Sequence, residues 1–432
     1  MHLFGGVITV TGNTFLMFSV FAIAFVGYFL GRITIKGVSL GTAGVFIMAL
    51  LFGAFFGQYI TGADYANVST SSYKIIETIG LILFVGSVGM IAGPNFFKNL
   101  KKNFKSYILI GFVIILFGCL ASLACFFIGR TFVVVPEEEA ALGITTNQYM
   151  MSMIVGIMSG SLTSTPAFSA AKATAATVVS AEAVDSIQNV VTVGHAIAYI
   201  FGVIGVVLFV QLIPKFVKAN MDKERDLITI VDTGAGSIKD VNKKMFEIDE
   251  FGFGAFGLVV LVGVIVGAIK IPLSSAGLSG TTFSLTTTGG VLISGLVFTH
   301  FGHIGPISLK VDKKILESFR EFGLMLFLIG AGVPGGISFV RYFQPVYFLY
   351  GIIITIVPMI VGYFVAKKLL KLPLLNSLGS ITGGMTSTPA LGTLIRTAGT
   401  DDVASSYAST YPIALICVVL GSQFLILLFG AA

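Results

Sequence analysis

Charged side chains are scarce in this sequence, and their scarcity excludes most classes of soluble protein. Asp, Glu, Lys and Arg make up 11% of the 432 residues, against 55% hydrophobic residues. A soluble domain carries about a quarter charged residues. Alternating apolar and polar stretches of about ten residues, which are typical of membrane β-barrels, are also absent. The apolar residues instead form runs of roughly 18 to 25, long enough to cross a bilayer as helices.

The chain also lacks the residue clusters that mark disulfide frameworks, metal sites and enzyme active sites. Its cysteines, Cys119, Cys125 and Cys417, lie in apolar runs without a CxxC pair, so we expect small buried side chains. Its glycine-rich stretches follow no predicted strand and precede no P-loop lysine, which argues against a nucleotide site. No nucleophile–base pair lies within the apolar runs. We therefore expect no enzyme, no metal site and no cofactor beyond a coupling sodium ion or proton.

The apolar runs divide into uninterrupted spans and two interrupted segments. The uninterrupted runs are 14–31, 38–58, 75–93, 106–129, 188–213, 253–271, 285–303, 320–340, 346–367 and 402–429. The first lacks a preceding basic region, so it is predicted to be a retained helix and not a signal peptide. The interrupted segments, 149–180 and 375–399, are each too short on either side of a central proline to cross twice. Each is predicted to be a re-entrant hairpin of two short helices joined by an irregular tip.

The distribution of basic residues supports this topology. With both termini outside, in the periplasm, most of the 26 Lys and Arg residues fall on the cytoplasmic side. The exceptions outside the hairpins are Lys74, Arg130, Lys270 and Arg341. Such asymmetry is the positive-inside pattern of inner-membrane proteins. The net charge of +6 reflects these loops and indicates no nucleic-acid partner.

The two halves of the chain align with each other. Glu77–Phe84 corresponds to Arg320–Phe327, and Tyr199 corresponds to Tyr411. Each half has five spanning helices and one re-entrant hairpin, and because five is odd the second copy is inverted in the membrane. The predicted fold is an all-α polytopic membrane protein of two inverted repeats, at 1–213 and 252–432. A polar cytoplasmic linker with some helix is predicted between them, at 214–251.

The same five residues, Thr-Ser-Thr-Pro-Ala, interrupt both hairpins. A bilayer tolerates such breaks only where the backbone faces protein or a water-filled cavity, and matched breaks in two halves indicate the binding site of a secondary transporter. Proline suits the first position of a helix, which offers free N–H groups to an anion. The hydroxyls can donate to a carboxylate or coordinate a cation. The predicted substrate-binding residues of the two breaks are Thr163, Ser164, Thr165, Pro166, Thr386, Ser387, Thr388 and Pro389.

One basic residue follows each break. Lys172 lies six residues after Pro166, and Arg396 lies seven after Pro389. Ionisable groups at membrane depth are costly and usually functional. We expect Arg396, and with it Lys172, to pair with substrate carboxylates; the alternative is that either side chain snorkels to the interface.

Other polar residues give weaker signals. His195 is either a proton-coupling group or a hydrogen-bonded packing histidine. Asp402 either balances a coupling cation, or orients Arg396, or is a solvated acid at a helix start. The remaining candidates for coupling or for supporting the site are Asn189, Tyr199, Tyr407 and Tyr411.

At these residues the chain resembles the aspartate:alanine exchanger family of bacterial membrane transporters. The segments that carry the resemblance are Gly160–Ala167, Gly383–Ala390, Phe84–Pro94 and Gly289–Leu296. The resemblance implies exchange of amino acids or dicarboxylates across the inner membrane without ATP. Many members carry soluble regulatory domains between the halves, and the linker here is too short for them. The sequence departs from its own second half at His195, which aligns with Tyr407.

The sequence thus predicts an antiporter of small carboxylates that works by alternating access, with the hairpin-bearing unit sliding as an elevator. The expected partners are an anionic substrate, the lipid bilayer and a second copy in a homodimer. A sodium-coupled glutamate or dicarboxylate symporter with the same duplicated plan remains an alternative. An ion channel or a cation/proton exchanger is disfavoured because no paired carboxylates lie in the middle of a span.

Overall fold

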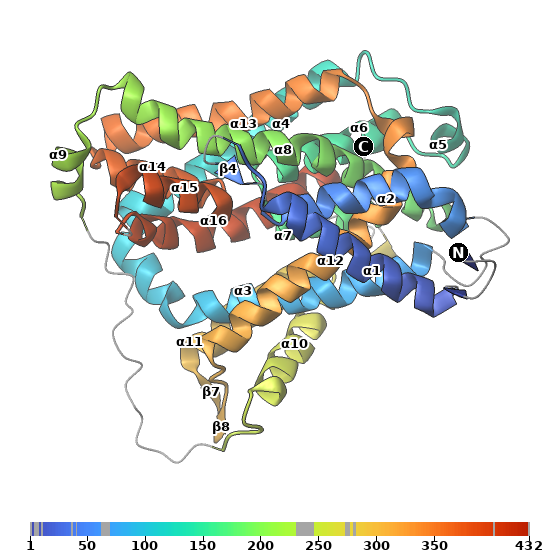
Figure 1. Cartoon of the computed structure of the whole chain (residues 1–432), viewed down its shortest axis with the longest axis horizontal. Helices are drawn as coiled ribbons and strands as arrows, with labels where there is room; N and C mark the ends of the chain where they lie inside the picture. Colours follow the sequence, from blue (N-terminus) through green and yellow to red (C-terminus); the bar gives the residue numbers. More distant parts are fainter. Residues whose placement is uncertain are drawn as a thin grey trace. The chain divides into compact units, whose positions relative to one another are not determined.

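The structure of the chain is a computed structural model (Figure 1). It describes residues 2–3, 8–9, 12–35, 38–39, 41–61, 70–229, 246–272, 277–279, 282–400 and 402–430. The middle of the predicted linker, residues 230–245, lies outside the described residues.

The described chain is mostly helical. Its α-helices are α1 (Gly12–Gly31), α2 (Ala43–Thr61), α3 (Thr70–Asn103), α4 (Leu109–Gly129), α5 (Glu137–Ala141), α6 (Thr146–Ser161), α7 (Thr165–Ala175), α8 (Val184–Phe216), α9 (Met221–Asp226), α10 (Phe253–Ala268), α11 (Thr286–Phe301), α12 (Lys313–Tyr342), α13 (Val346–Phe364), α14 (Leu374–Gly384), α15 (Thr388–Ala398) and α16 (Val403–Leu425). Turns of π-helix at Phe104–Ile108, Val365–Leu369 and Ile426–Gly430 adjoin α4, α13 and α16.

The strands are short and lie before the first helix or in the connections between helices. They form antiparallel pairs of two residues each: β1 (His2–Leu3) with β2 (Ile8–Thr9), β3 (Thr34–Ile35) with β4 (Val38–Ser39), β5 (Ile271–Pro272) with β6 (Thr282–Phe283), and β7 (His303–Ile304) with β8 (Ile307–Ser308). The predicted all-α class therefore holds for most of the length of the apolar runs, because every uninterrupted run contains a helix and only the ends of some runs lie in the short strands.

Among the described residues, 7 helices are long and apolar enough to cross a membrane, and α2 and α10 contain shorter apolar helices. Large apolar side chains such as Phe25, Phe55 and Phe132 are exposed, at 77%, 72% and 79%. In water such exposure would be costly, whereas lipid covers it. The chain is a multi-pass membrane protein.

The chain divides into two compact units. Unit 1 contains α1, α2, the part of α3 up to Phe84 and the part of α12 from Ser318. Its core joins apolar residues of α1 and α2, such as Val20 and Val45, to Ile329 of α12.

Two glycines allow α3 and α12 to cross closely within unit 1. A Cβ on Gly80 would lie 2.3 Å from the Phe327 nitrogen, and one on Gly323 would lie 2.5 Å from the Phe84 nitrogen. These four positions are equivalent in the sequence alignment of the two halves, and their contacts are reciprocal.

Unit 2 contains the rest of the described helices, including both interrupted segments. There α6 packs on α8 and α14 packs on α16, while α7 packs on α16 and α15 packs on α8 (Figure 1). Each interrupted segment therefore contacts a long helix from its own half and one from the other half. Glycines allow the close approach, since a Cβ on Gly160 would lie 2.4 Å from the His195 carbonyl oxygen and one on Gly383 2.6 Å from that of Tyr407.

The contact between α6 and α8 predicts a position-specific cost for an added methyl group. Gly160→Ala should lower the free energy of unfolding by about 1–3 kcal/mol, because the backbone of α8 must move to admit the Cβ. Thermal unfolding of the purified protein in detergent measures the effect. Gly257→Ala on α10 is the matched control, since a Cβ there meets nothing within 4 Å. Equal melting temperatures for the two variants would contradict the packing described.

Candidate functional site

Both Thr-Ser-Thr-Pro-Ala segments have the predicted helix–break–helix form. We call α6 and α7 hairpin 1, with its tip at 162–164, and α14 and α15 hairpin 2, with its tip at 385–387. The second arm of each hairpin begins at a threonine followed by proline, Thr165-Pro166 and Thr388-Pro389, as predicted. The proline lies in the first turn, where its missing N–H costs no hydrogen bond.

The two tips have the same backbone geometry. Thr163 and Thr386 both adopt the left-handed conformation, each with φ of 50°. Their N–H groups donate to Gly160 and Gly383, and the following serines donate to carbonyls five residues back. This is the Schellman end of a helix, in which glycine is the usual left-handed residue. A β-branched threonine there is strained, so it needs a compensating contact.

That contact is a reciprocal pair of hydrogen bonds between the tips. The Thr163 Oγ1 donates to the Met385 carbonyl oxygen at 3.1 Å, and the Thr386 Oγ1 donates to the Leu162 carbonyl oxygen at 2.7 Å. Both threonines are buried, at 8% and 6% exposure. Each hydroxyl thus satisfies a carbonyl that the end of the opposite helix leaves free. The pair brings the starts of α7 and α15 to one place.

Serines precede the two second arms, and they differ in their hydrogen bonds. The Ser164 Oγ accepts a weak hydrogen bond from the Ala167 N–H at 3.4 Å, which makes Ser164 the N-cap of α7. Ser387 occupies the N-cap of α15, yet its buried Oγ has no hydrogen-bond partner. A buried hydroxyl without a partner costs about 1–3 kcal/mol. The Ser164 hydroxyl thus caps its helix, whereas the start of α15 has no side-chain cap.

The two hairpins also differ in accessibility. Thr165 is buried, and four residues along α7 the Ser169 Oγ shares a hydrogen bond of 2.9 Å with the Thr288 Oγ1 on α11. Thr388, the equivalent of Thr165, is exposed, and its Oγ1 lies 3.3 Å from the Tyr407 hydroxyl. The start of hairpin 2's second arm is thus open where that of hairpin 1 is covered.

The two predicted cations both fold back along their helices toward the tips. The Lys172 Nζ lies 5.7 Å from the ring centre of Phe168, one turn nearer the tip, and Lys172 is buried. The Arg396 Nη2 donates to the Thr393 Oγ1 at 3.1 Å, one turn nearer its own tip. Arg396 is exposed and Lys172 is not, which parallels the difference between the hairpin starts.

His195 lies on α8, packs against hairpin 1 and is fully buried. Its ring stacks on Phe168 at 4.1 Å between centroids, and its Nδ1 lies 2.8 Å from the Ser159 Oγ. The Ser159 Oγ also lies 2.7 Å from the Gly156 carbonyl oxygen, and the tautomer of His195 sets which atom donates in the bond between Ser159 and His195.

The remaining candidates flank the tips as matched pairs or lie at helix starts. Tyr199 stacks on His195 at 5.2 Å, and Tyr411 stacks on Tyr407 at 5.3 Å, both one helical turn apart. Asp402 precedes α16 and its Oδ2 accepts from the Thr400 hydroxyl at 2.9 Å. Asn189 is half-buried in the first turns of α8.

Three functional neighbours were missed in the sequence. Thr393 holds the Arg396 guanidinium, Ser159 fixes the His195 ring, and Phe168 lies under both Lys172 and His195. Thr393 and Phe168 lie three and four residues before the cations, so helical spacing gave a usable signal. Ser159 gave none, because its partner is on another helix.

Groups of positive charge gather at the tips. Two helix starts carry partial positive charge, hydroxyls lie next to them, and a cation on each hairpin points back toward them. No group of three or more His, Cys, Asp or Glu able to hold a metal ion occurs among the described residues.

The reciprocal bonds predict strong coupling between the tips. Thr163→Val and Thr386→Val should each lower the free energy of unfolding by about 1–3 kcal/mol, because each leaves a buried carbonyl unsatisfied and keeps the backbone strain. The double variant should deviate from additivity by about 0.5 kcal/mol or more in thermal unfolding. Thr397→Val is the control, since its hydroxyl donates to the Thr393 carbonyl within its own helix. Strictly additive losses would contradict the coupling.

Comparison with known proteins places these features in a family. The family model described as "Predicted Permease Membrane Region", of the aspartate–alanine exchanger type, matches residues 19–215 and 255–427. An uncharacterized transporter of Bacteroides fragilis is 27% identical over 94% of this chain and 97% of that protein. One of Desulfotalea psychrophila is 25% identical over 95% and 96%.

The extent of these matches decides the assignment. The family model covers most of the chain on both sides of the linker, including both hairpins. The alignment with the Bacteroides protein runs over 558 positions, more than the 432 residues here, so that relative has segments without a counterpart in this chain. The chain belongs to the aspartate–alanine exchanger type of permease, a family of multi-pass membrane transporters.

Proposed function

We propose that the protein is an antiporter that exchanges small carboxylates, such as aspartate for alanine or one dicarboxylate for another, across the bacterial inner membrane. The observation that carries the proposal is the reciprocal pair of threonine bonds, which brings the starts of α7 and α15 together. Two helix starts in one place form a site for a carboxylate. Family membership supports transport, and the geometry supports the choice of anion.

Each part of the site has a role in this proposal. The unpartnered Ser387 hydroxyl donates to the substrate carboxylate at the start of α15. The Arg396 guanidinium reaches it from the exposed side with two parallel hydrogen bonds, and the buried Lys172 adds positive potential from hairpin 1. The candidates for coupling to a proton or a sodium ion are His195, Asp402, Asn189, Tyr199, Tyr407 and Tyr411.

An inverted repeat fits the contacts. Equivalent residues of the two halves meet reciprocally at the hairpin tips, and again where Gly80 meets Phe327 and Gly323 meets Phe84. A two-fold relation between the halves produces such reciprocal contacts, and an axis in the membrane plane would make the repeats inverted. We propose that 1–213 and 252–432 are inverted membrane repeats joined by a cytoplasmic linker at 214–251, with both termini in the periplasm.

Alternating access fits the unequal exposure of the hairpins. Hairpin 1 is covered at Ser169 by α11 while hairpin 2 is open at Thr388, as in a carrier accessible from one side. Both hairpins belong to one compact unit, which supports an elevator in which unit 2 carries the substrate. An elevator needs a fixed scaffold, and a homodimer supplies one.

Counterflow in proteoliposomes tests the function. Vesicles loaded with unlabelled aspartate, alanine, glutamate or succinate should take up the labelled compound, and empty vesicles should not. Arg396→Gln should raise the half-saturation concentration roughly 10- to 100-fold, because a charge-assisted hydrogen bond is lost. Thr388→Val should also weaken uptake.

Arg341→Gln on α12, a basic residue outside both hairpins, is the matched control and should leave uptake unchanged. Unchanged uptake in both Arg396→Gln and Thr388→Val would refute the site. Uptake into empty vesicles driven by a sodium gradient would refute exchange and favour the sodium-coupled symporter. Unitary currents without saturation would favour a channel.

A further inference from the structure

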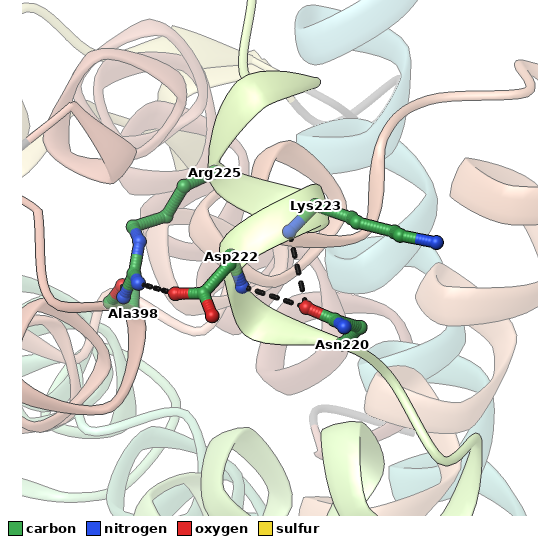
Figure 2. Close-up of polar contacts among 5 residues, drawn as sticks. All are labelled: Asn220, Asp222, Lys223, Arg225 and Ala398. Atoms are coloured by element: carbon green, nitrogen blue, oxygen red, sulfur yellow. Dashed lines mark hydrogen bonds and ion pairs between the residues drawn. The ribbon is translucent and has the colours of Figure 1, made fainter.

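The chain that leaves α8 turns back sharply and does not continue into the linker as a straight helix. Lys218 adopts the left-handed conformation with φ of 51°, and the Ala219 N–H donates to the Pro214 carbonyl oxygen at 2.9 Å. This Schellman end redirects the chain. The Asn220 Oδ1 then accepts from the Asp222 and Lys223 N–H groups and caps α9 (Figure 2). We call residues 217–229 the strap.

Arg225, within the strap, contacts the second arm of hairpin 2. The Arg225 Nη1 donates to the Ala398 carbonyl oxygen at 3.1 Å, and its Nη2 pairs with Asp222 (Figure 2). Ala398 is the last residue of α15, where carbonyls are free and the helix dipole favours a cation. Gly399 follows with φ of 69°, and a Cβ there would lie 2.8 Å from the Arg225 Nη1. The Arg225 guanidinium therefore caps the C-terminal end of α15.

Thr229, the last residue of the strap, contacts the first arm. The Thr229 N–H donates to the Asn376 Oδ1 at 3.0 Å, and the Asn376 Nδ2 donates to the Thr229 carbonyl oxygen at 2.8 Å. Asn376 lies on α14 and is fully buried. The side-chain amide of Asn376 thus pairs with both backbone groups of one residue, its N–H and its C=O. The strap bridges the bases of both arms of hairpin 2.

Apolar contacts hold the strap in place. Ala219, Met221 and Ile228 pack on a buried cluster that includes Leu375 of α14 and Leu394 of α15. The cluster also contains Val210 of α8, so it joins hairpin 2 to the helix from which the strap emerges.

Hairpin 1 is closed at its base in a different way. The Gln148 side chain on α6 donates to the Val178 carbonyl oxygen, which lies just after α7. That bond stays within the hairpin itself. In hairpin 2 the bridge comes from residues that follow α8, and the family model leaves 216–254 unmatched. The strap therefore lies outside the residues that the family model matches.

We propose that the strap positions hairpin 2, with Arg225 and Asn376 as its positioning residues. By fixing the bases of α14 and α15 to α8, it sets where the tip at 385–387 stands. Only the transport measurement below rests on the proposed function. The contacts between the strap and hairpin 2 are the same whichever ligand the hairpin binds.

Hydrogen–deuterium exchange of the purified full chain tests the strap directly. In Arg225→Met and Asn376→Ala, amides of 374–398 should exchange about 10-fold faster or more, while those of 146–175 stay within about twofold. Lys223→Met is the matched control: it removes the same charge from the same helix, and its exposed side chain points away from Ala398 (Figure 2). Arg225→Lys keeps a donor for Ala398 and should restore much of the protection.

Counterflow supplies the second readout. The half-saturation concentration should rise about threefold or more in Arg225→Met with the maximal rate changed less than about twofold, whereas mere loss of folded protein would lower the maximal rate. An unchanged rate of deuterium exchange in 374–398, or an equal rise of that rate in both hairpins, would refute the proposal that the strap holds hairpin 2. An unchanged half-saturation concentration would overturn its positioning role. If no carboxylate is exchanged at all, the proposed function fails, and the deuterium measurement still decides the strap.

Discussion

The arrangement of the site depends on two hydrogen bonds between the hairpin tips. Thr163 and Thr386 each hold a left-handed backbone that glycine would adopt without strain. A glycine there would lack the hydroxyl that satisfies the carbonyl of the opposite tip. Leu162 and Met385 are buried, where a carbonyl without a hydrogen bond is costly, so the bond offsets the strain. This requirement gives a physical reason for threonine, and not glycine, at both positions.

The close packing of unit 2 follows from bringing the tips together. Hairpin arms reach each other only if α6 and α14 lie close against α8 and α16, and Gly160 and Gly383 provide that approach. The same packing leaves different surroundings for the two second arms: α11 covers Ser169, while Thr388 remains exposed beside Tyr407. The strap is a further difference between the hairpins. Among the contacts described, it joins the bases of the two arms of hairpin 2 and not those of hairpin 1.

Much of the fold was predictable because apolar length and proline position act locally. The uninterrupted runs became helices, and Thr165-Pro166 and Thr388-Pro389 began the second arms. The exact starts were predicted less well: proline was expected at the first helical position, whereas Thr165 and Thr388 occupy it and Ser164 and Ser387 are the N-cap residues. The contact of Lys172 with Phe168 follows from helical spacing, whereas the His195–Ser159 and Arg225–Ala398 contacts join segments far apart in the sequence.

The sequence by itself determined the membrane class, the helices, the two breaks and the residue types at each tip, because these depend on hydrophobicity and on the backbone preferences of a few neighbouring residues. Only the tertiary structure decided that the tips bond to each other, that Lys172 is buried while Arg396 is exposed, and that the start of the linker binds hairpin 2. Those facts depend on which helix lies opposite which, and a hydrogen bond between distant residues leaves no periodic trace in the chain.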